Sequence, residues 1–216
     1  MKKILVTAFE PFGGRSTNPS IVIQKSLPVS VYGCKVLKEV MPVSGKDAGE
    51  KIRALLQEHK PDIVLSFGLA AGETAVRIER FGLNIKDYGI KDNSGERPSG
   101  EKICVSGPAA YMVSIPPEKI VEALIKKHIP AYASSHAGTY VCNTLIYEAM
   151  RAIDELGLNT KYLFVHFPLS TEEAVSEKPV KFPPSLPEKM LKDAGNIILK
   201  HIAKEYLAKK PFSALP

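Results

Sequence analysis

Short apolar runs rich in β-branched residues alternate along the chain with longer segments whose apolar residues recur at intervals of three and four. The short runs predict strands over residues 3–8, 35–42, 62–67, 75–83, 131–135 and 162–166. The longer segments predict helices over residues 19–27, 46–59, 117–128, 142–156 and 187–207. Such an alternation is typical of an α/β sandwich around a largely parallel or mixed sheet.

Length and loop composition refine this prediction. The 216 residues, 44% of them hydrophobic, suffice for one sizeable core, so we expect a single domain over residues 1–216. Asn18-Pro19 is a helix start signal, and Ser44 is a candidate cap for the next helix. Residues 87–110 are rich in Gly, Pro, Asn, Ser and charges, which in a compact domain is typical of a lid or binding loop.

Charge and hydropathy argue against several function classes. The chain carries 29 Lys and Arg against 23 Asp and Glu, but the basic residues are scattered without interleaved aromatics, so we expect no nucleic-acid partner. The apolar run at the amino terminus ends at Glu10-Pro11, too soon for an export signal or a membrane span. The three cysteines form no metal-type CxxC pair and no disulfide framework. We therefore expect a cytoplasmic protein without membrane contact or structural disulfides.

Cys142 is a candidate nucleophile, because a Gly-containing turn leads from the strand over residues 131–135 directly into the helix that this residue begins. At a helix amino terminus, the helix dipole and the unpaired backbone N–H groups favour a thiolate and lower the thiol pKa. The same N–H groups can receive the oxyanion of a tetrahedral intermediate. On spacing alone, a buried structural cysteine remains the alternative.

A nucleophilic cysteine needs a base, and the chain has five histidines. His166 ends an apolar strand, where α/β proteins place their sites, and His136 lies in the turn before Cys142. Both remain candidates at this point. The other three lie near the ends of predicted helices, where an exposed role is the default, and are set aside: His59, His128 and His201.

Glu79 is the candidate orienting group, because it lies inside an otherwise apolar strand and burying an acid without a partner is costly. It can orient a catalytic histidine. It can equally form a salt bridge to Arg77 or Arg80, and the sequence alone favours neither role.

Phe9 and Phe12 stand on either side of Glu10-Pro11, just before Gly13-Gly14. Two phenylalanines in a loop predict an apolar pocket or anchors that hold the loop on the core. The Gly-Gly pair resembles a phosphate cradle only weakly, since neither a Walker Lys-Ser/Thr nor GxGxxG is present.

A series of short segments carries a family resemblance: Phe9-Glu10-Pro11-Phe12-Gly13-Gly14 with Asn18-Pro19, Lys60-Pro61-Asp62-Ile63, Ile78-Glu79-Arg80 with Asn84, Asp92-Asn93, Gly107-Pro108-Ala109-Ala110-Tyr111, Ala137-Gly138-Thr139-Tyr140-Val141-Cys142-Asn143, and Val165-His166 before Pro168. In this order along nearly the whole chain, they resemble the pyrrolidone carboxyl peptidases, also called pyroglutamyl-peptidase I.

The resemblance implies a catalytic set of Cys142, His166 and Glu79, which selects His166 over His136. It also implies a three-layer α/β/α sandwich of the phosphorylase/hydrolase type, with no metal or cofactor. Family members are usually cytoplasmic and often tetrameric. The implied substrate is a peptide with an amino-terminal pyroglutamyl residue.

The resemblance further implies a pocket for the lactam ring of this residue. The positions that match its lining are Phe9, Phe12, Ile90, Tyr140 and Val141, with backbone groups of Asn18 and Leu69 pairing with the ring amide. Pyroglutamate has no charged amino terminus, so an apolar slot can accept it and reject ordinary amino termini through their desolvation cost.

Several positions depart from the family pattern. Gly89 stands where relatives carry an arginine proposed to help bind the oxyanion, so Lys86, Lys91, Arg97 or the Cys142 N–H are the candidates for that role. The family's His-Val/Ile-Pro-Tyr is His166-Phe167-Pro168-Leu169 here. The cysteine that some heat-loving relatives carry is absent beside Pro184-Ser185-Leu186, which excludes an intersubunit disulfide there.

The function predicted from these observations is removal of amino-terminal pyroglutamate by a cysteine peptidase. In it, His166, oriented by Glu79, takes the proton of Cys142, and the thiolate attacks the pyroglutamyl carbonyl. One alternative is a non-catalytic pyroglutamyl- or peptide-binding protein, suggested by Gly89. The other is a phosphorolytic transferase of the same fold that uses Gly13-Gly14 for phosphate.

Overall fold

The computed structural model describes residues 1–176 and 181–207. It contains all six strands expected from the sequence: β1 (Lys3–Phe9), β3 (Cys34–Met41), β4 (Ile63–Leu69), β5 (Val76–Leu83), β7 (Ala131–His136) and β8 (Lys161–Phe167). It also contains the five expected helices: α1 (Pro19–Ser26), α2 (Gly45–His59), α3 (Pro117–Ile125), α4 (Val141–Glu155) and α6 (Glu188–Tyr206).

The sequence did not predict five short elements. These are β2 (Ser30–Val31), β6 (Ala110–Met112), β9 (Leu169–Ser170), β10 (Ser185–Leu186) and α5 (Thr171–Ser176). Strands of two or three residues are too short to show a period, and the six residues of α5 are less than two helical turns.

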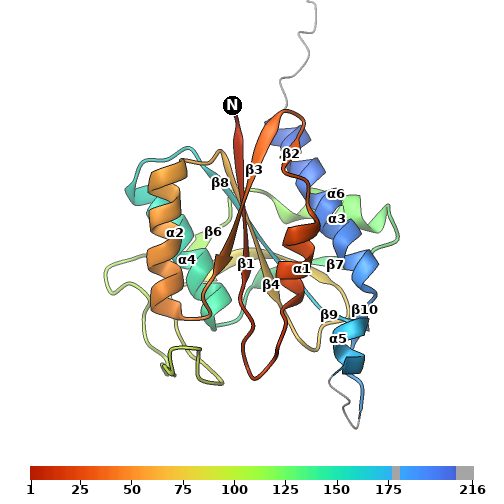
Figure 1. The fold of residues 1–216 in the computed structure, drawn as a ribbon. Helices are drawn as coiled ribbons and strands as arrows, with labels where there is room; N and C mark the ends of the chain where they lie inside the picture. The colour runs from red at the N-terminus through yellow and green to blue at the C-terminus, as the bar shows by residue number, and fades with distance from the viewer. Residues whose placement is uncertain (177–180, 208–216) are drawn as a thin grey trace, which may run out of the picture.

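Eight strands form one mixed sheet in the order β2-β3-β1-β4-β8-β5-β6, with β7 also paired to β5 (Figure 1). The central strands β3, β1, β4 and β8 are parallel, as are β5 and β7. By contrast, β5 runs antiparallel to β8, and β2 and β6 are antiparallel additions at the ends of the sheet. The mixed, mostly parallel sheet predicted from the sequence is thereby confirmed.

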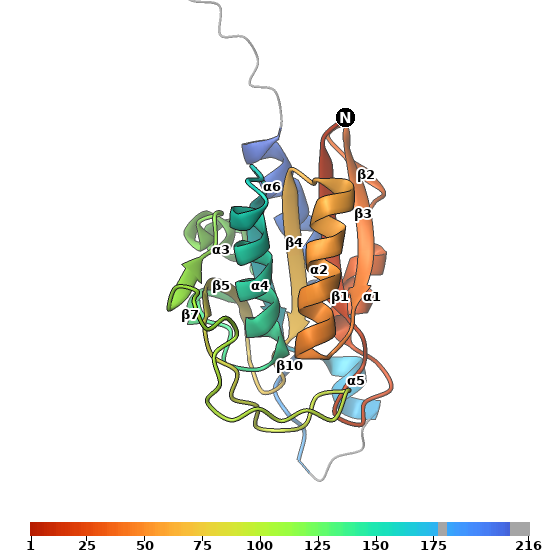
Figure 2. The same cartoon turned by 90° about the vertical axis from the view of Figure 1, so that its left-hand side faces the viewer.

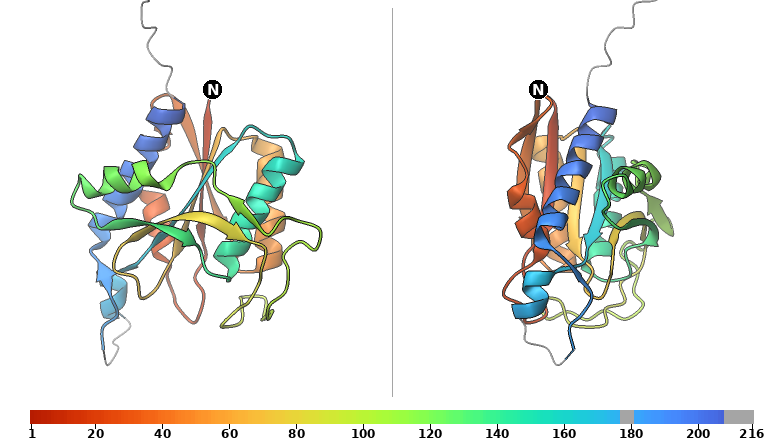
Figure 3. Two further views of the ribbon diagram at one scale, coloured as in Figure 1. Left: turned by 180° about the vertical axis from the view of Figure 1, so that it is seen from behind. Right: turned by 90° about the vertical axis from the view of Figure 1, so that its right-hand side faces the viewer.

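Helices cover both faces of this sheet, which gives the predicted three layers. Helices α2 and α4 lie side by side on one face (Figure 2). Helix α6 lies along the other face, with α1 and α3 against it (Figure 3). Asn18 and Ser44 cap α1 and α2, where their side-chain oxygens accept from the backbone N–H groups of Ser20 and Asp47 at 3.1 and 3.3 Å. Both predicted caps are confirmed.

The parallel arrangement gathers the carboxyl ends of β1, β3, β4 and β8 at one edge of the sheet, which is where α/β folds place their sites. All seven residues of β4 are buried between the helix layers. None of the helices within the described ranges is long and apolar enough to cross a membrane. That residues 1–216 form a single domain stays a prediction.

Candidate active site

Three elements bring the predicted catalytic residues together. Cys142 is the second residue of α4, His166 lies near the end of β8, and Glu79 lies in the middle of β5. The antiparallel pairing of β5 with β8 sets Glu79 opposite Phe164, two residues from His166 and on the same face of the sheet as it. Asn143 fixes the start of α4 to the end of β5, since its side chain exchanges hydrogen bonds with the backbone of Leu83.

Gly68 of β4 creates the space in which the thiol and the imidazole meet. A Cβ atom at this position would lie 3.1 Å from Cys142 Sγ, 3.0 Å from His166 Cδ2 and 2.9 Å from Phe164 Cζ. Each of these distances is tighter than an ordinary contact, so only glycine fits without displacing these side chains. The sulfur and the imidazole edge that carries Nε2 therefore border one small space.

The buried carboxylate of Glu79 contacts both a histidine and an arginine. Its Oε1 lies 2.7 Å from His166 Nδ1 and 3.2 Å from Arg77 Nε. Arg80 pairs instead with Glu118 at 2.7 Å. The two roles that the sequence left open for Glu79 therefore occur together, with Arg77 as the salt-bridge partner. Since a carboxylate accepts only, the contact places a proton on His166 Nδ1 and leaves Nε2 free to act as a base.

The environment of Cys142 contradicts one expectation from the sequence. Burial and, to a smaller extent, the negative charge of Glu79 raise the pKa of the Cys142 thiol to about 12, against the lowering effect of Arg77 and of the residue's own backbone N–H. The expected lowering at a helix start is wrong for the resting site, because desolvation against the sheet outweighs the N–H groups. The resting form is a thiol, which needs a base at the moment of attack.

The ring of His136, the competing base, is engaged within its own turn. Its side chain is exposed, and its Nδ1 accepts a hydrogen bond from the backbone N–H of Gly138 at 3.1 Å. His136 therefore shapes the turn before α4.

The predicted pocket residues form two aromatic groups. Tyr140 lies between Phe12 and Tyr88, with ring centroids 6.0 and 4.8 Å apart, and donates from its hydroxyl to the Lys91 carbonyl. Phe9 packs on Phe164 at 6.4 Å, next to the histidine. Phe9 is the last residue of β1 and is buried, so its placement in a loop was wrong, whereas Phe12 is a loop residue.

The remaining pocket positions differ in exposure. Ile90 is 50% exposed, and its Cδ1 would lie 3.9 Å from a Cβ at Gly13, so it faces the Phe12 loop. Val141 and Leu69 are buried beside Cys142 and Gly68 in the chain. Asn18 is buried as well, and its amide donates to the carbonyl of Glu10, which holds the loop between β1 and α1.

Gly89 is exposed, and nothing lies within 4 Å of the position where its Cβ would be. Of the candidate replacements, Lys86 forms an ion pair with Glu101 at 3.3 Å. Arg97 lines the same small surface hollow as Gly89, where its Nε donates to the Tyr88 carbonyl. Lys91 is exposed.

Asp92 anchors the loop that carries Gly89, Ile90 and Lys91. Its carboxylate is buried and accepts from the N–H of Gly45 at the start of α2, and from the N–H and hydroxyl of Ser94. Burial raises the pKa of this carboxyl, but its hydrogen bonds lower it more, so the net pKa lies below the ordinary value. The loop is thus fixed to α2 by an ionised side chain.

Replacing Asp92 with alanine is expected to cost about 2–3 kcal/mol of unfolding free energy and to raise KM roughly tenfold, because several buried N–H groups lose their acceptor. Urea unfolding and steady-state kinetics measure both effects. Because the pKa of Asp92 is lowered in the folded protein, its carboxylate stabilises the fold at pH values above the ordinary carboxyl pKa, and this stabilisation is lost as pH falls through the lowered pKa. The difference in unfolding free energy between wild type and variant should therefore shrink at low pH. Asp47→Ala, at an exposed acid in the first turn of α2, is the control. Equal effects of both variants would contradict the anchoring role.

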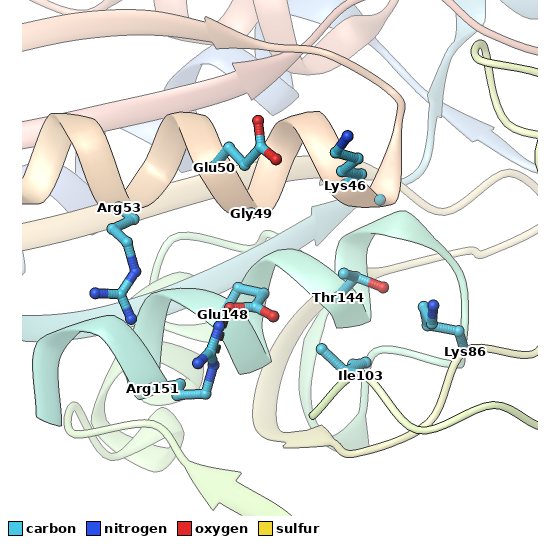
Figure 4. Close-up of a pocket in the computed structure, with 10 residues that line it drawn as sticks. Lys46, Gly49, Glu50, Arg53, Lys86, Ile103, Thr144, Glu148 and Arg151 are labelled. Carbon is cyan, nitrogen blue, oxygen red and sulfur yellow. Dashed lines mark hydrogen bonds and ion pairs between the residues drawn. The ribbon is translucent and has the colours of Figure 1, made fainter. Parts of the chain in front are cut away.

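Two other hollows lack the catalytic residues. One of about 320 Å³ lies between α2 and α4, where Arg53, Glu148 and Arg151 face one another (Figure 4). Its charges are satisfied locally, since Arg151 pairs with Glu148 at 2.6 Å. A second hollow, beside Gly13-Gly14, contains the carboxylate of Glu173, which accepts from the Thr17 hydroxyl at 2.8 Å.

Gly68 was not predicted as part of the site, and Arg77 was predicted only as one of two possible salt-bridge partners of Glu79. A glycine inside a buried strand is a signal of close approach, and Gly68 follows Phe67 in a fully buried run. The two-residue period of a strand places Arg77 on the same face as Glu79 and Arg80 on the opposite face. Both signals were present in the sequence.

Comparison with known proteins identifies close relatives. The sequence model of the family described as Pyroglutamyl peptidase matches residues 2–205. Pyrrolidone-carboxylate peptidase 1 of Caldanaerobacter subterraneus subsp. tengcongensis is 41% identical over 203 residues, 93% of this chain and 100% of the relative. The pyrrolidone-carboxylate peptidase of Thermococcus kodakarensis is 39% identical over 175 residues, 81% of this chain and 85% of the relative.

Solved structures agree with these matches. A pyrrolidone carboxyl peptidase structure from Pyrococcus furiosus superimposes with a TM-score of 0.90 and 35% identity, covering 95% of this chain and 100% of that chain. Pyroglutamyl peptidase I from Bacillus amyloliquefaciens gives a TM-score of 0.87 and 33% identity, covering 95% of this chain and 98% of that chain.

Proposed function

The chain belongs to the pyroglutamyl peptidase family and is a cysteine-type exopeptidase that removes amino-terminal pyroglutamate, and we propose that Cys142, His166 and Glu79 carry out this cleavage. The observation that carries the proposal is the shared space at Gly68, which borders both the thiol sulfur and the imidazole. The 2.7 Å contact of His166 with Glu79 supports it, because it leaves the imidazole edge next to the sulfur unprotonated.

The reaction begins with a neutral thiol. His166 Nε2 takes the proton of Cys142 as the sulfur forms a bond to the pyroglutamyl carbonyl carbon, and Glu79 stabilises the imidazolium. Collapse of the tetrahedral intermediate breaks the peptide bond, and His166 returns the proton to the leaving amine. Water, deprotonated by His166, then hydrolyses the thioester and releases pyroglutamate. The backbone N–H of Cys142 and its neighbours at the start of α4 receive the oxyanion.

We assign the lactam ring to the apolar surface formed by Phe12, Tyr140 and Ile90. The packing of Phe12 against Tyr140 and the half-exposed side chain of Ile90 support this assignment, since they present apolar area beside the start of α4. An ordinary amino terminus would bring an ammonium charge onto this surface without a partner, at a large desolvation cost. Phe9, Val141 and the backbones of Asn18 and Leu69 complete the proposed pocket.

The hollow beside Gly13-Gly14 gives little support to a phosphorolytic reaction. It is lined by both Arg15 and Glu173, so it offers a phosphate dianion no net positive charge. A homotetrameric assembly, which rests on the family resemblance, and a cytoplasmic location, which rests on the resemblance and on the composition, remain part of the proposal.

The test is an assay with matched peptides that start with pyroglutamate, proline or glutamine. We expect release of free pyroglutamate from the first peptide only, at a rate independent of phosphate and abolished by iodoacetamide. Chromatography of the products measures it. Recovery of the intact peptide would identify a binding protein, and an absolute phosphate requirement would identify a transferase; either result overturns the proposal.

A further inference from the structure

Arg77 is held in an unusual position for a strand arginine, beside a fully buried acid. Its guanidinium donates from Nη1 to Glu73 Oε1 at 2.9 Å, and from Nη2 to Ser134 Oγ at 3.1 Å and to the His136 carbonyl at 3.0 Å. Glu73 is itself fixed by the hydroxyl of Tyr132 at 2.9 Å. The guanidinium is therefore anchored by the segment before β5 and by β7. Its Nε lies 3.2 Å from Glu79 Oε1 as an ion pair, without the geometry of a hydrogen bond.

Glu79 depends on this cation. Its side chain has no solvent exposure, and its Oε1 carries both the Arg77 and the His166 contacts. Its Oε2 has no hydrogen-bond partner among the described residues. A buried carboxylate is stable as an anion only with compensating charge, and a neutral imidazole supplies a dipole but not a charge.

We propose that Arg77 is a positioning residue of the catalytic site, which compensates the buried charge of Glu79, keeps its carboxylate at His166 and so sets the pH range of the reaction. The proposal rests on the proposed function of the triad and extends it by a fourth, charged member. Arg77 touches neither Cys142 nor the substrate surface, and it acts through Glu79. The charged and titratable groups that face this cluster are Glu73, Tyr132, Cys142 and His166, whereas His136 contributes only its backbone carbonyl.

The charge of Arg77 acts on the nucleophile as well as on Glu79. As a cation near Cys142, it opposes the negative charge of Glu79 and favours the thiolate. Removing this charge should therefore make the thiol harder to deprotonate, which moves activity to higher pH.

The test compares Arg77→Gln, which removes the charge, with Arg77→Lys, which keeps it. We expect kcat/KM for a pyroglutamyl arylamide to fall roughly 10- to 100-fold in R77Q and to recover most of the way in R77K. In the plot of kcat/KM against pH, the limb at low pH should move to higher pH by about half a pH unit or more in R77Q only. If Arg77 had a structural role alone, kcat/KM would fall equally in both variants and the limb at low pH would not move. That result would overturn the proposal.

Alkylation of Cys142 by iodoacetamide, followed by mass spectrometry, gives a readout without substrate. The rate of alkylation rises with pH, and this rise should occur at higher pH in R77Q but not in R77K. If the wild type fails to release pyroglutamate while this shift is present, the proposed function is wrong and the role of Arg77 stands. If the shift is absent, the role of Arg77 is wrong whatever the activity.

Glu73→Gln covers the case in which R77Q does not fold. It removes a negative charge from the other side of Arg77, so the low-pH limb should move slightly in the opposite direction, to lower pH. Thermal unfolding confirms that each variant is folded before its kinetics are compared. An unmoved limb in E73Q would overturn the proposal.

Discussion

Replacing Cys142 with serine is expected to lower kcat/KM for a pyroglutamyl arylamide by roughly 10³-fold or more while leaving the fold intact. Serine occupies the same space over Gly68, so the unfolding free energy should change by no more than about 1 kcal/mol. Its hydroxyl is a much weaker nucleophile than sulfur, and the site is built around a cysteine that already needs help from His166 to lose its proton. Steady-state kinetics and urea unfolding measure the two quantities.

Cys104→Ser is the matched control, because Cys104 is a second free and partly exposed cysteine that no step of the mechanism uses. It should keep wild-type activity. Iodoacetamide should modify Cys142 more rapidly as pH rises above neutrality, since burial raises the pKa of this thiol to about 12. Full activity in C142S, or loss of activity in C104S alone, would show that the nucleophile is another residue.

The long elements of the fold could be predicted because each buries one face over several periods. The seven buried residues of β4 and the 15 residues of α4 are examples of segments with unambiguous patterns. The position of β5 in the sheet could not be predicted. It joins β8 antiparallel in an otherwise parallel centre, and that choice depends on packing between residues far apart in the sequence, such as Glu79 and His166.

The sequence could propose residues for the site but not their electrostatics. Family resemblance selected His166, and the structure sets its ring beside the space shared with the thiol. The pKa of Cys142 was predicted in the wrong direction, because a sequence shows that a residue begins a helix but not how far the folded chain desolvates its thiol. For the same reason, the sequence could not show that Glu79 would serve Arg77 and His166 at once.

Replacing Glu79 with glutamine is expected to lower kcat by roughly 10²–10⁴-fold with little change in KM. Glutamine has the same shape but no charge, so it neither stabilises the imidazolium nor secures the proton on Nδ1. Its amide nitrogen can donate to Nδ1 instead, which puts the proton on Nε2 and removes the base that Cys142 needs. The change also leaves the buried side of Arg77 without its anion, so we expect a loss of about 3 kcal/mol in unfolding free energy.

Glu118→Gln makes the same chemical change on a glutamate that pairs with Arg80, the arginine on the opposite face of β5. Because this carboxylate is half-exposed, its ion pair contributes little, and both kinetics and stability should match the wild type. The two variants thus compare a buried ion pair, Glu79 with Arg77, and a surface ion pair, Glu118 with Arg80, on the same strand. Wild-type kcat in E79Q together with a loss of stability would mean that Glu79 only neutralises Arg77 in the core, and that His166 is oriented without it.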